Sequence, residues 1–133
     1  MNMEIYFEGK KKVIANYNGL IINTDQPLKS GGDGSAPAPF DLFLASIGTC
    51  AGIYIKSFCD KRNIPTDDIR IIQSMNYNSN LGLIDKIDLE IKLPADFPEK
   101  YKDALINAAD LCAVKKHLKN PPEINVTTLV APN

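Results

Sequence analysis

The first 25 residues contain three short apolar runs rich in Ile, Val, Tyr and Phe, residues that favour strands. The polar segments 8–11 and 16–19 separate three such runs. Asn18-Gly19 favours a tight hairpin turn because both residues accept a positive φ. We therefore predict a three-stranded antiparallel meander over residues 3–25.

A long helix is the next element that the pattern predicts. Residues 27–39 are rich in Gly and Pro and are expected to form a loop. Pro39 and Asp41 favour a helix start, and Pro65 follows the basic segment near Arg62 where the helix should end. The first half is apolar on every side, so we expect a buried helix that is covered partly by a second chain.

Residues 69–77 and 83–93 are two further strand candidates, and polar and apolar positions alternate cleanly in the second. Residues 78–82 between them have turn composition, which predicts a second hairpin. Pro98 is expected to open a helical segment, and residues 124–130 are expected to form a final strand. This order of elements predicts an α+β fold with a mostly antiparallel sheet, in one domain over residues 1–133.

Composition narrows the class of function. The chain has 15 Lys and Arg against 16 Asp and Glu, so its net charge of -1 offers no cationic field for nucleic acid. The longest uncharged apolar stretch, residues 42–55, is shorter than the ~20 residues of a membrane span, and Glu4 and Glu8 do not fit a signal peptide. Three widely spaced cysteines do not form a secreted disulfide framework, so we expect a cytoplasmic protein.

Cys50 is the first candidate for chemistry, because it lies in the middle of the long helix among small residues. Two interpretations are open: a buried thiol that packs as a small hydrophobe, or a reactive thiolate for which the small neighbours leave room. Cys112 lies near a predicted helix break and is able to meet Cys50 in space. Cys59 follows Cys50 by roughly 13 Å along the helix, at ~1.5 Å per residue, and is expected to be a bystander.

Two segments carry a resemblance to a known family. Residues 32–50, from the loop Gly-Asp-Gly-Ser-Ala-Pro-Ala-Pro to Cys50, resemble the OsmC-like family. Residues 112–118 are similar to the C-x-V-x-K-x-L pattern around the second cysteine of that family. The resemblance implies an OsmC-like α+β fold and an intertwined homodimer with two active sites at its interface, each of which reduces organic hydroperoxides.

The resemblance also implies the role of each site residue. Cys50 is expected to attack the peroxide as a thiolate, and Cys112 to resolve the sulfenic acid as a disulfide, which an external dithiol such as a lipoyl group reduces. Phe40, Phe43 and Thr49 are expected to line the pocket. No metal and no organic cofactor are expected.

Two polar residues of the family pattern are missing. Phe40 stands where the family has a Glu ten residues before the reactive cysteine, and Asp41 is either its substitute or only a helix-start carboxylate. The family Arg of the N-terminal meander has no counterpart. Lys10, Lys11 or Lys12 would have to stabilise the thiolate instead, without the planar fork of a guanidinium.

These departures keep a second hypothesis open: an OsmC-like dimer with weak catalysis that binds a small molecule or senses redox state. In a third hypothesis both cysteines only pack the core, and Cys50→Ala leaves every redox property unchanged. His117 is the only histidine, at a spacing that suits no familiar zinc site, and is expected to be a solvated residue at a helix end.

Overall fold

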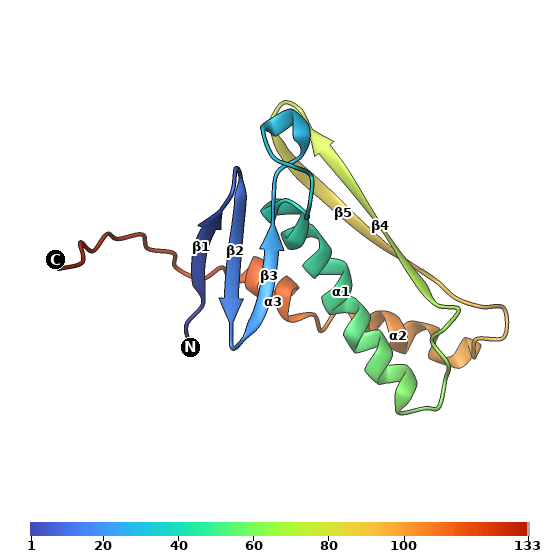
Figure 1. The fold of residues 1–133 in the computed structure, drawn as a ribbon. Coiled ribbons are helices and arrows are strands. Elements are labelled where there is room, and N and C mark those ends of the chain that lie inside the picture. Colours follow the sequence, from blue (N-terminus) through green and yellow to red (C-terminus); the bar gives the residue numbers. More distant parts are fainter. Residues whose placement is uncertain (133) are drawn as a thin grey trace. The chain divides into compact units, whose positions relative to one another are not determined.

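The computed structural model describes residues 1–132 (Figure 1). Its elements follow in the order β1 (Glu4–Glu8), β2 (Lys12–Tyr17), β3 (Leu20–Thr24), η1 (Leu28–Ser30), α1 (Pro39–Asp60), β4 (Arg70–Asn78), β5 (Leu83–Lys92), η2 (Glu99–Tyr101), α2 (Lys102–Ala109) and α3 (Ala113–Lys119). The contacts divide the chain into two units, Met1–Ser46 and a second that begins at Ile47. The assignment of one domain to residues 1–133 stays a prediction.

The first unit contains the predicted meander. The strands pair antiparallel in the order β1-β2-β3, and Ala15 lies opposite Ile5 on one side and Ile22 on the other. Asn18 and Gly19 have φ values of 51° and 80°, which is the left-handed geometry that the hairpin requires. The N–H of Gly19 also donates to Asn16 Oδ1 at 3.2 Å. The predictions of the meander and of its turn are confirmed.

The loop after β3 is organised around one buried carboxylate. Asp25 is 1% exposed and accepts hydrogen bonds from the backbone N–H groups of Gln26, Asp33 and Ser35. The hydroxyl of Ser35 donates to the same carboxylate at 2.6 Å. These donors, with the Ser35 hydroxyl as the largest cause, lower the pKa of Asp25 to about 2. The Gly-rich loop is therefore a fixed structure whose donors converge on a charged group.

The pKa of Asp25 predicts an acid dependence of stability. A carboxyl whose pKa is lower in the folded chain than in the unfolded chain stabilises the fold above the unfolded pKa of about 4. This contribution is lost as the pH falls from about 4 towards 2. We expect Asp25→Asn to unfold at lower urea concentration than wild type above about pH 4.5, and the difference to shrink below pH 4. Asp68→Asn, an exposed control, should show no such convergence.

The second unit contains the remainder of α1, the β4–β5 hairpin and the C-terminal helices. Strands β4 and β5 pair antiparallel over their whole length, with one irregularity between Asn76 and Tyr77. The helix approaches the hairpin closely: a Cβ added at Gly52 would meet the side chain of Ile71 at 3.5 Å. The predicted strands over residues 69–77 and 83–93 are confirmed, and so is the helical segment after Pro98.

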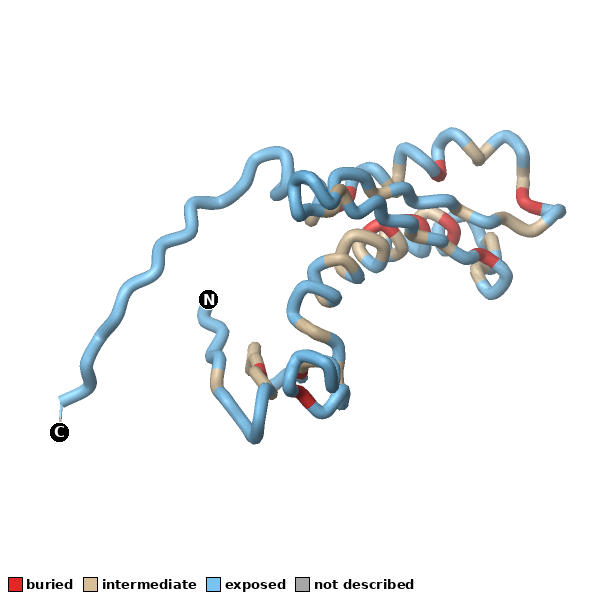
Figure 2. The backbone as a smooth tube through the Cα atoms, turned by 90° about the horizontal axis from the view of Figure 1, so that it is seen from above, coloured by how far each residue is buried: buried red, intermediate tan, exposed pale blue. Residues whose placement is uncertain are grey.

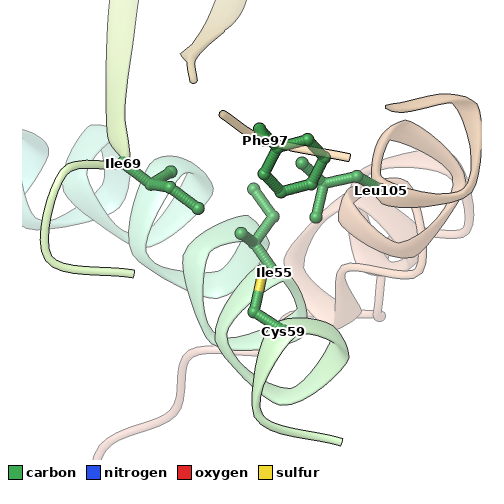
Figure 3. Packing of buried hydrophobic residues seen from close by; sticks show 5 residues of the cluster. All are labelled: Ile55, Cys59, Ile69, Phe97 and Leu105. Atoms are coloured by element: carbon green, nitrogen blue, oxygen red, sulfur yellow. The ribbon is translucent and has the colours of Figure 1, made fainter. Parts of the chain in front are cut away.

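The core of the second unit lies beside the C-terminal half of α1. It is a cluster of five buried side chains from four parts of the chain (Figure 3): Ile55, Cys59, Ile69, Phe97 and Leu105. Cys59 is fully buried and burial raises its pKa, which keeps the thiol protonated and poorly reactive. The expectation that Cys59 is a bystander agrees with this place in the core.

This chain by itself covers α1 on one face, and the expectation that a second chain covers the rest of the helix stays a prediction. In α1 only Ala51, Ile55 and Cys59 are buried, and their spacing of four residues puts them on one narrow face. Ile53 is 57% exposed. Figure 2 shows that most of the chain is coloured as exposed or intermediate. Of the other apolar positions, Phe58 packs partly buried against the core, whereas Phe40, Phe43 and Ile53 are exposed. By length and composition alone, α1 is long and apolar enough to cross a membrane. The core helix of a soluble protein often has the same length and composition.

The expectation of a strand over residues 124–130 is also wrong. No strand is present in this part of the described chain, and the segment runs out as an extended tail. Ile124, Val126 and Leu129 are 81%, 90% and 95% exposed. Apolar alternation expresses only the preference for a strand, whereas a strand also needs a neighbour that accepts and donates its backbone hydrogen bonds.

Candidate functional site: the Cys50–Cys112 thiol pair

The second unit brings two of its three cysteines together. Cys50 projects from α1, and Cys112 is the residue immediately before α3. The thiols of Cys50 and Cys112 form a side-chain hydrogen bond, and both cysteines are free. Two sulfurs within hydrogen-bond reach need only a small movement to form a disulfide. The structure therefore juxtaposes the two cysteines that the sequence singled out.

The surroundings of Cys50 favour its thiolate. The backbone N–H of Val114 is the largest cause of a lowered Cys50 pKa, followed by the thiol of Cys112, and the N–H of Ala113 also contributes. Both backbone groups belong to the first turn of α3, where N–H groups have no partner within the helix. Hydrogen bonds to the charged form lower the pKa of a thiol. Cys50 is also partly exposed, unlike the other two cysteines.

Cys112 has the opposite environment. Its side chain is 2% exposed, and burial is the largest cause that raises its pKa. The hydrogen bond to Cys50 and the repulsion by a thiolate there raise it further, whereas the N–H groups of Lys115 and Val114 lower it. Cys50 is therefore the thiol that ionises first, and Cys112 is the one that keeps its proton.

These backbone groups are the part of the site that sequence reasoning missed. The family pattern implied a charged side chain beside Cys50, whereas the donors are main-chain N–H groups of Ala113 and Val114. The available signal was the placement of Cys112 at a helix break, because the residues after a break open a new helix with free N–H groups.

A cavity of about 650 Å³ adjoins the pair. Its wall is mostly apolar and comes from α1, the β4–β5 hairpin and the C-terminal helices; it includes Ile47, Ile71, Ile87, Leu105, Ile106 and Leu118. Cys112 is part of this wall, together with Asp110 and Lys115, and Cys50 is not among the lining residues. The cavity can accommodate an apolar group of moderate size next to the second cysteine.

The predicted polar substitutes all lie in the first unit. The carboxylate of Asp41 accepts the N–H of Ala38 at 3.1 Å, which is the contact of a helix-start carboxylate. The ammonium groups of Lys10 and Lys12 contact the carboxylate of Asp33 at 3.4 Å and 3.6 Å. A role of these three residues beside Cys50 stays a prediction.

The predicted pocket residues are exposed. The rings of Phe40 and Phe43 stack with their centroids 5.6 Å apart in the first unit. Thr49 is exposed and is not among the residues that line the cavity. Nδ1 of His117 donates to the carbonyl oxygen of Ala113 at 2.7 Å, so the ring is tied to its own helix. Residues 1–132 contain no group of three or more His, Cys, Asp and Glu side chains that could hold a metal ion.

The fold and the site define a class of α+β protein in which a long helix presents one cysteine to a second cysteine at the start of a C-terminal helix. The chain belongs to the OsmC-like protein family, whose pattern matches residues 32–127. The resemblance seen in the sequence is thus confirmed. A search of curated proteins finds no significant match.

Solved structures with the same fold come from several bacteria. A Psychrobacter arcticus protein named for osmotic stress induction and detoxification response has a TM-score of 0.72 at 19% identity, over 87% of this chain and 86% of its own. The OsmC organic hydroperoxide resistance protein of Legionella pneumophila has a TM-score of 0.51 at 19% identity, over 90% of both chains. OhrB, the organic hydroperoxide resistance protein of Bacillus subtilis, has a TM-score of 0.50 at 18% identity, over 91% and 93%. At these identities the likeness establishes the fold.

Proposed function

We propose that the protein is a thiol peroxidase that reduces organic hydroperoxides with a dithiol as the final electron donor. The observation that carries this proposal is the difference in pKa and burial between the two thiols of the pair. Cys50 is partly exposed and its pKa is lowered by N–H groups of α3, whereas Cys112 is buried, has a raised pKa and donates to Cys50. A peroxidase of this type needs one thiolate to attack and one adjacent thiol to resolve.

The reaction then proceeds in three balanced steps. The Cys50 thiolate attacks one peroxide oxygen; the O–O bond breaks, the leaving alkoxide takes a proton, and Cys50 becomes a sulfenic acid. The Cys112 sulfur attacks the Cys50 sulfur and releases water as the disulfide forms. An external dithiol returns both cysteines to thiols and is itself oxidised to a disulfide. No metal or organic cofactor takes part.

The apolar cavity favours an organic hydroperoxide over hydrogen peroxide as the substrate. Its aliphatic wall offers a water-excluding surface to the alkyl part of a substrate and offers little to hydrogen peroxide. Two of the structural neighbours are named for resistance to organic hydroperoxides, in agreement with this choice. The reducing cytoplasm is the compartment that we propose, because it keeps the pair in its thiol form.

A homodimer is part of the same proposal. A second copy would cover three surfaces of this chain. These are the exposed apolar positions of α1, the open edges of both small sheets and the exposed tail after α3. A two-stranded sheet such as β4–β5 is by itself marginally stable, which adds a reason for association.

The first test is stopped-flow oxidation of the reduced protein by cumene hydroperoxide and by hydrogen peroxide, followed by turnover with dihydrolipoamide. We expect a faster reaction with cumene hydroperoxide than with hydrogen peroxide, and sustained turnover with the dithiol. Dihydrolipoamide without protein is the control. A rate no greater than that of a free thiol with either peroxide would contradict the proposal.

The cavity also favours a second candidate, a binding or redox-sensing protein with weak catalysis. A 650 Å³ apolar space is large enough to hold a small molecule whether or not the thiols turn over. The same kinetic experiment separates the two candidates, because the second predicts slow oxidation and no preference for the organic peroxide.

A further inference from the structure

We propose that the ion pair between Asp110 and Lys115 positions the thiol pair: it fixes the short connection that carries Cys112 and thereby aims the first N–H groups of α3 at Cys50. This inference rests on the proposed function, since it explains how the nucleophile of that reaction is activated. It assigns a positioning role to two residues outside the C-x-V-x-K-x-L pattern, whose fixed lysine is Lys116.

The connection is short and is held at both ends by backbone hydrogen bonds. Helix α2 ends at Ala109, and the N–H groups of Asp110 and Leu111 donate back to Ile106 and Ala108 at 3.1 Å. Helix α3 opens where the N–H of Lys116 donates to the carbonyl oxygen of Cys112, also at 3.1 Å. Residues 110–112 alone therefore set the angle between the end of α2 and the start of α3.

The ion pair joins the two ends of this connection. Nζ of Lys115 lies 2.6 Å from Oδ1 of Asp110, so the last turn around α2 is linked directly to the first turn of α3. Cys112 lies between the two partners in the chain, and all three residues border the same cavity. A change in this link moves Cys112 and the N–H groups of the next two residues together.

Cys112 occupies the N-cap position of α3, and the N–H groups of Lys115 and Val114 lie close enough to its side chain to lower its pKa. The ring of His117 contacts the carbonyl oxygen of Ala113. The N–H groups of Ala113 and Val114 also interact with Cys50, so the sulfur on α1 is an acceptor for this helix end. An acceptor on a different element is reached only if α3 keeps its orientation, and this is what the ion pair supplies.

The positive charge of Lys115 does not by itself explain how the N–H groups of α3 are oriented towards Cys50. Its ammonium is neutralised by Asp110, whose own pKa Lys115 lowers. Both side chains are about half exposed, at 47% and 59%, and an exposed pair contributes little to global stability. If the ion pair positions α3, exchange of its two charges keeps the wild-type pKa of Cys50. If the positive charge of Lys115 acts on Cys50 directly, the exchange raises that pKa.

The experiment measures the reactivity of each cysteine separately. Trypsin leaves Cys50, Cys59 and Cys112 on three different peptides, 30–56, 57–61 and 103–115. The reduced protein is pulsed with iodoacetamide across the pH range, and alkylation of each peptide is quantified by mass spectrometry. This readout depends on the thiolate fraction of Cys50 and does not require peroxide turnover.

We expect Lys115→Met and Asp110→Asn each to raise the apparent pKa of Cys50 by about half a unit to one unit, which slows its alkylation near neutral pH roughly 3- to 10-fold. The exchanged double variant, Asp110→Lys with Lys115→Asp, should restore the wild-type profile. Asp60→Asn is the matched control, because it removes the Lys56–Asp60 ion pair of similar exposure on α1, keeps the tryptic cut after Lys56 and should leave the Cys50 profile unchanged.

Two outcomes would overturn the inference. An unchanged Cys50 profile in both single variants means that the ion pair does not orient α3. A double variant that folds with the wild-type unfolding midpoint but keeps a raised Cys50 pKa assigns the effect to the charge of Lys115 instead. If the predicted profiles appear while the wild-type protein fails to reduce cumene hydroperoxide, the positioning role stands and the proposed peroxidase function is wrong.

Discussion

Replacement of Cys50 by serine is expected to abolish hydroperoxide reduction, to the rate of the reaction without protein. A serine hydroxyl does not ionise near neutral pH and is a poor nucleophile towards an O–O bond, so the N–H groups of Val114 and Ala113 have no thiolate to stabilise. The fold should survive, because Cys50 is partly exposed and serine has a similar size. Stopped-flow oxidation of Cys50→Ser by cumene hydroperoxide measures the loss.

Cys112→Ser and Cys59→Ser are the controls for this variant. Cys112→Ser should keep the first oxidation of Cys50 and accumulate a sulfenic acid that dimedone traps, while turnover with dihydrolipoamide slows because no internal disulfide forms. Cys59→Ser should keep full turnover, since its thiol lies in the core away from the pair. Retained peroxidase activity in Cys50→Ser would show that the assignment of the nucleophile is wrong.

The protein is expected to sediment as a dimer, at twice its chain mass of 14.6 kDa. In the described chain, α1 buries only one face, and Ile53 on this helix is 57% exposed although its neighbours are apolar. Several further apolar side chains, among them Phe7, Val126 and Val130, are more than 80% exposed. A soluble monomer rarely leaves apolar surface of this extent uncovered. Analytical ultracentrifugation at micromolar concentration measures the mass.

Ile53→Asp tests which surface the second copy covers. A charge buried without a partner costs several kcal/mol, and each 1.4 kcal/mol weakens a dimer about tenfold, so we expect this variant to sediment as a monomer. Lys61→Asp, at the exposed residue that follows this helix, also adds an acidic group but removes no apolar contact and should leave the mass unchanged. A wild-type mass of one chain at micromolar concentration would contradict the dimer.

Local chemistry was sufficient to predict most elements of this fold. Asn18-Gly19 requires positive φ values that only a tight turn uses, and the structure has them. Pro39 begins α1 and the alternation of residues 83–93 reappears as β5, because a proline and a two-residue period act within a few positions of the chain. The same reasoning failed at residues 124–130, where the partner strand that a sheet requires is not part of the local sequence.

The sequence by itself determined the order of the strands and helices as far as α3, the OsmC-like family and the identity of the two candidate cysteines, since each of these is written in short motifs. Only the tertiary structure decided that Cys50 and Cys112 share a hydrogen bond, and that backbone N–H groups of α3 stabilise the first thiol where the family pattern implied a charged side chain. The physical reason is that residues 62 positions apart meet through the packing of α1 against the C-terminal helices, and main-chain donors have no signature in residue type.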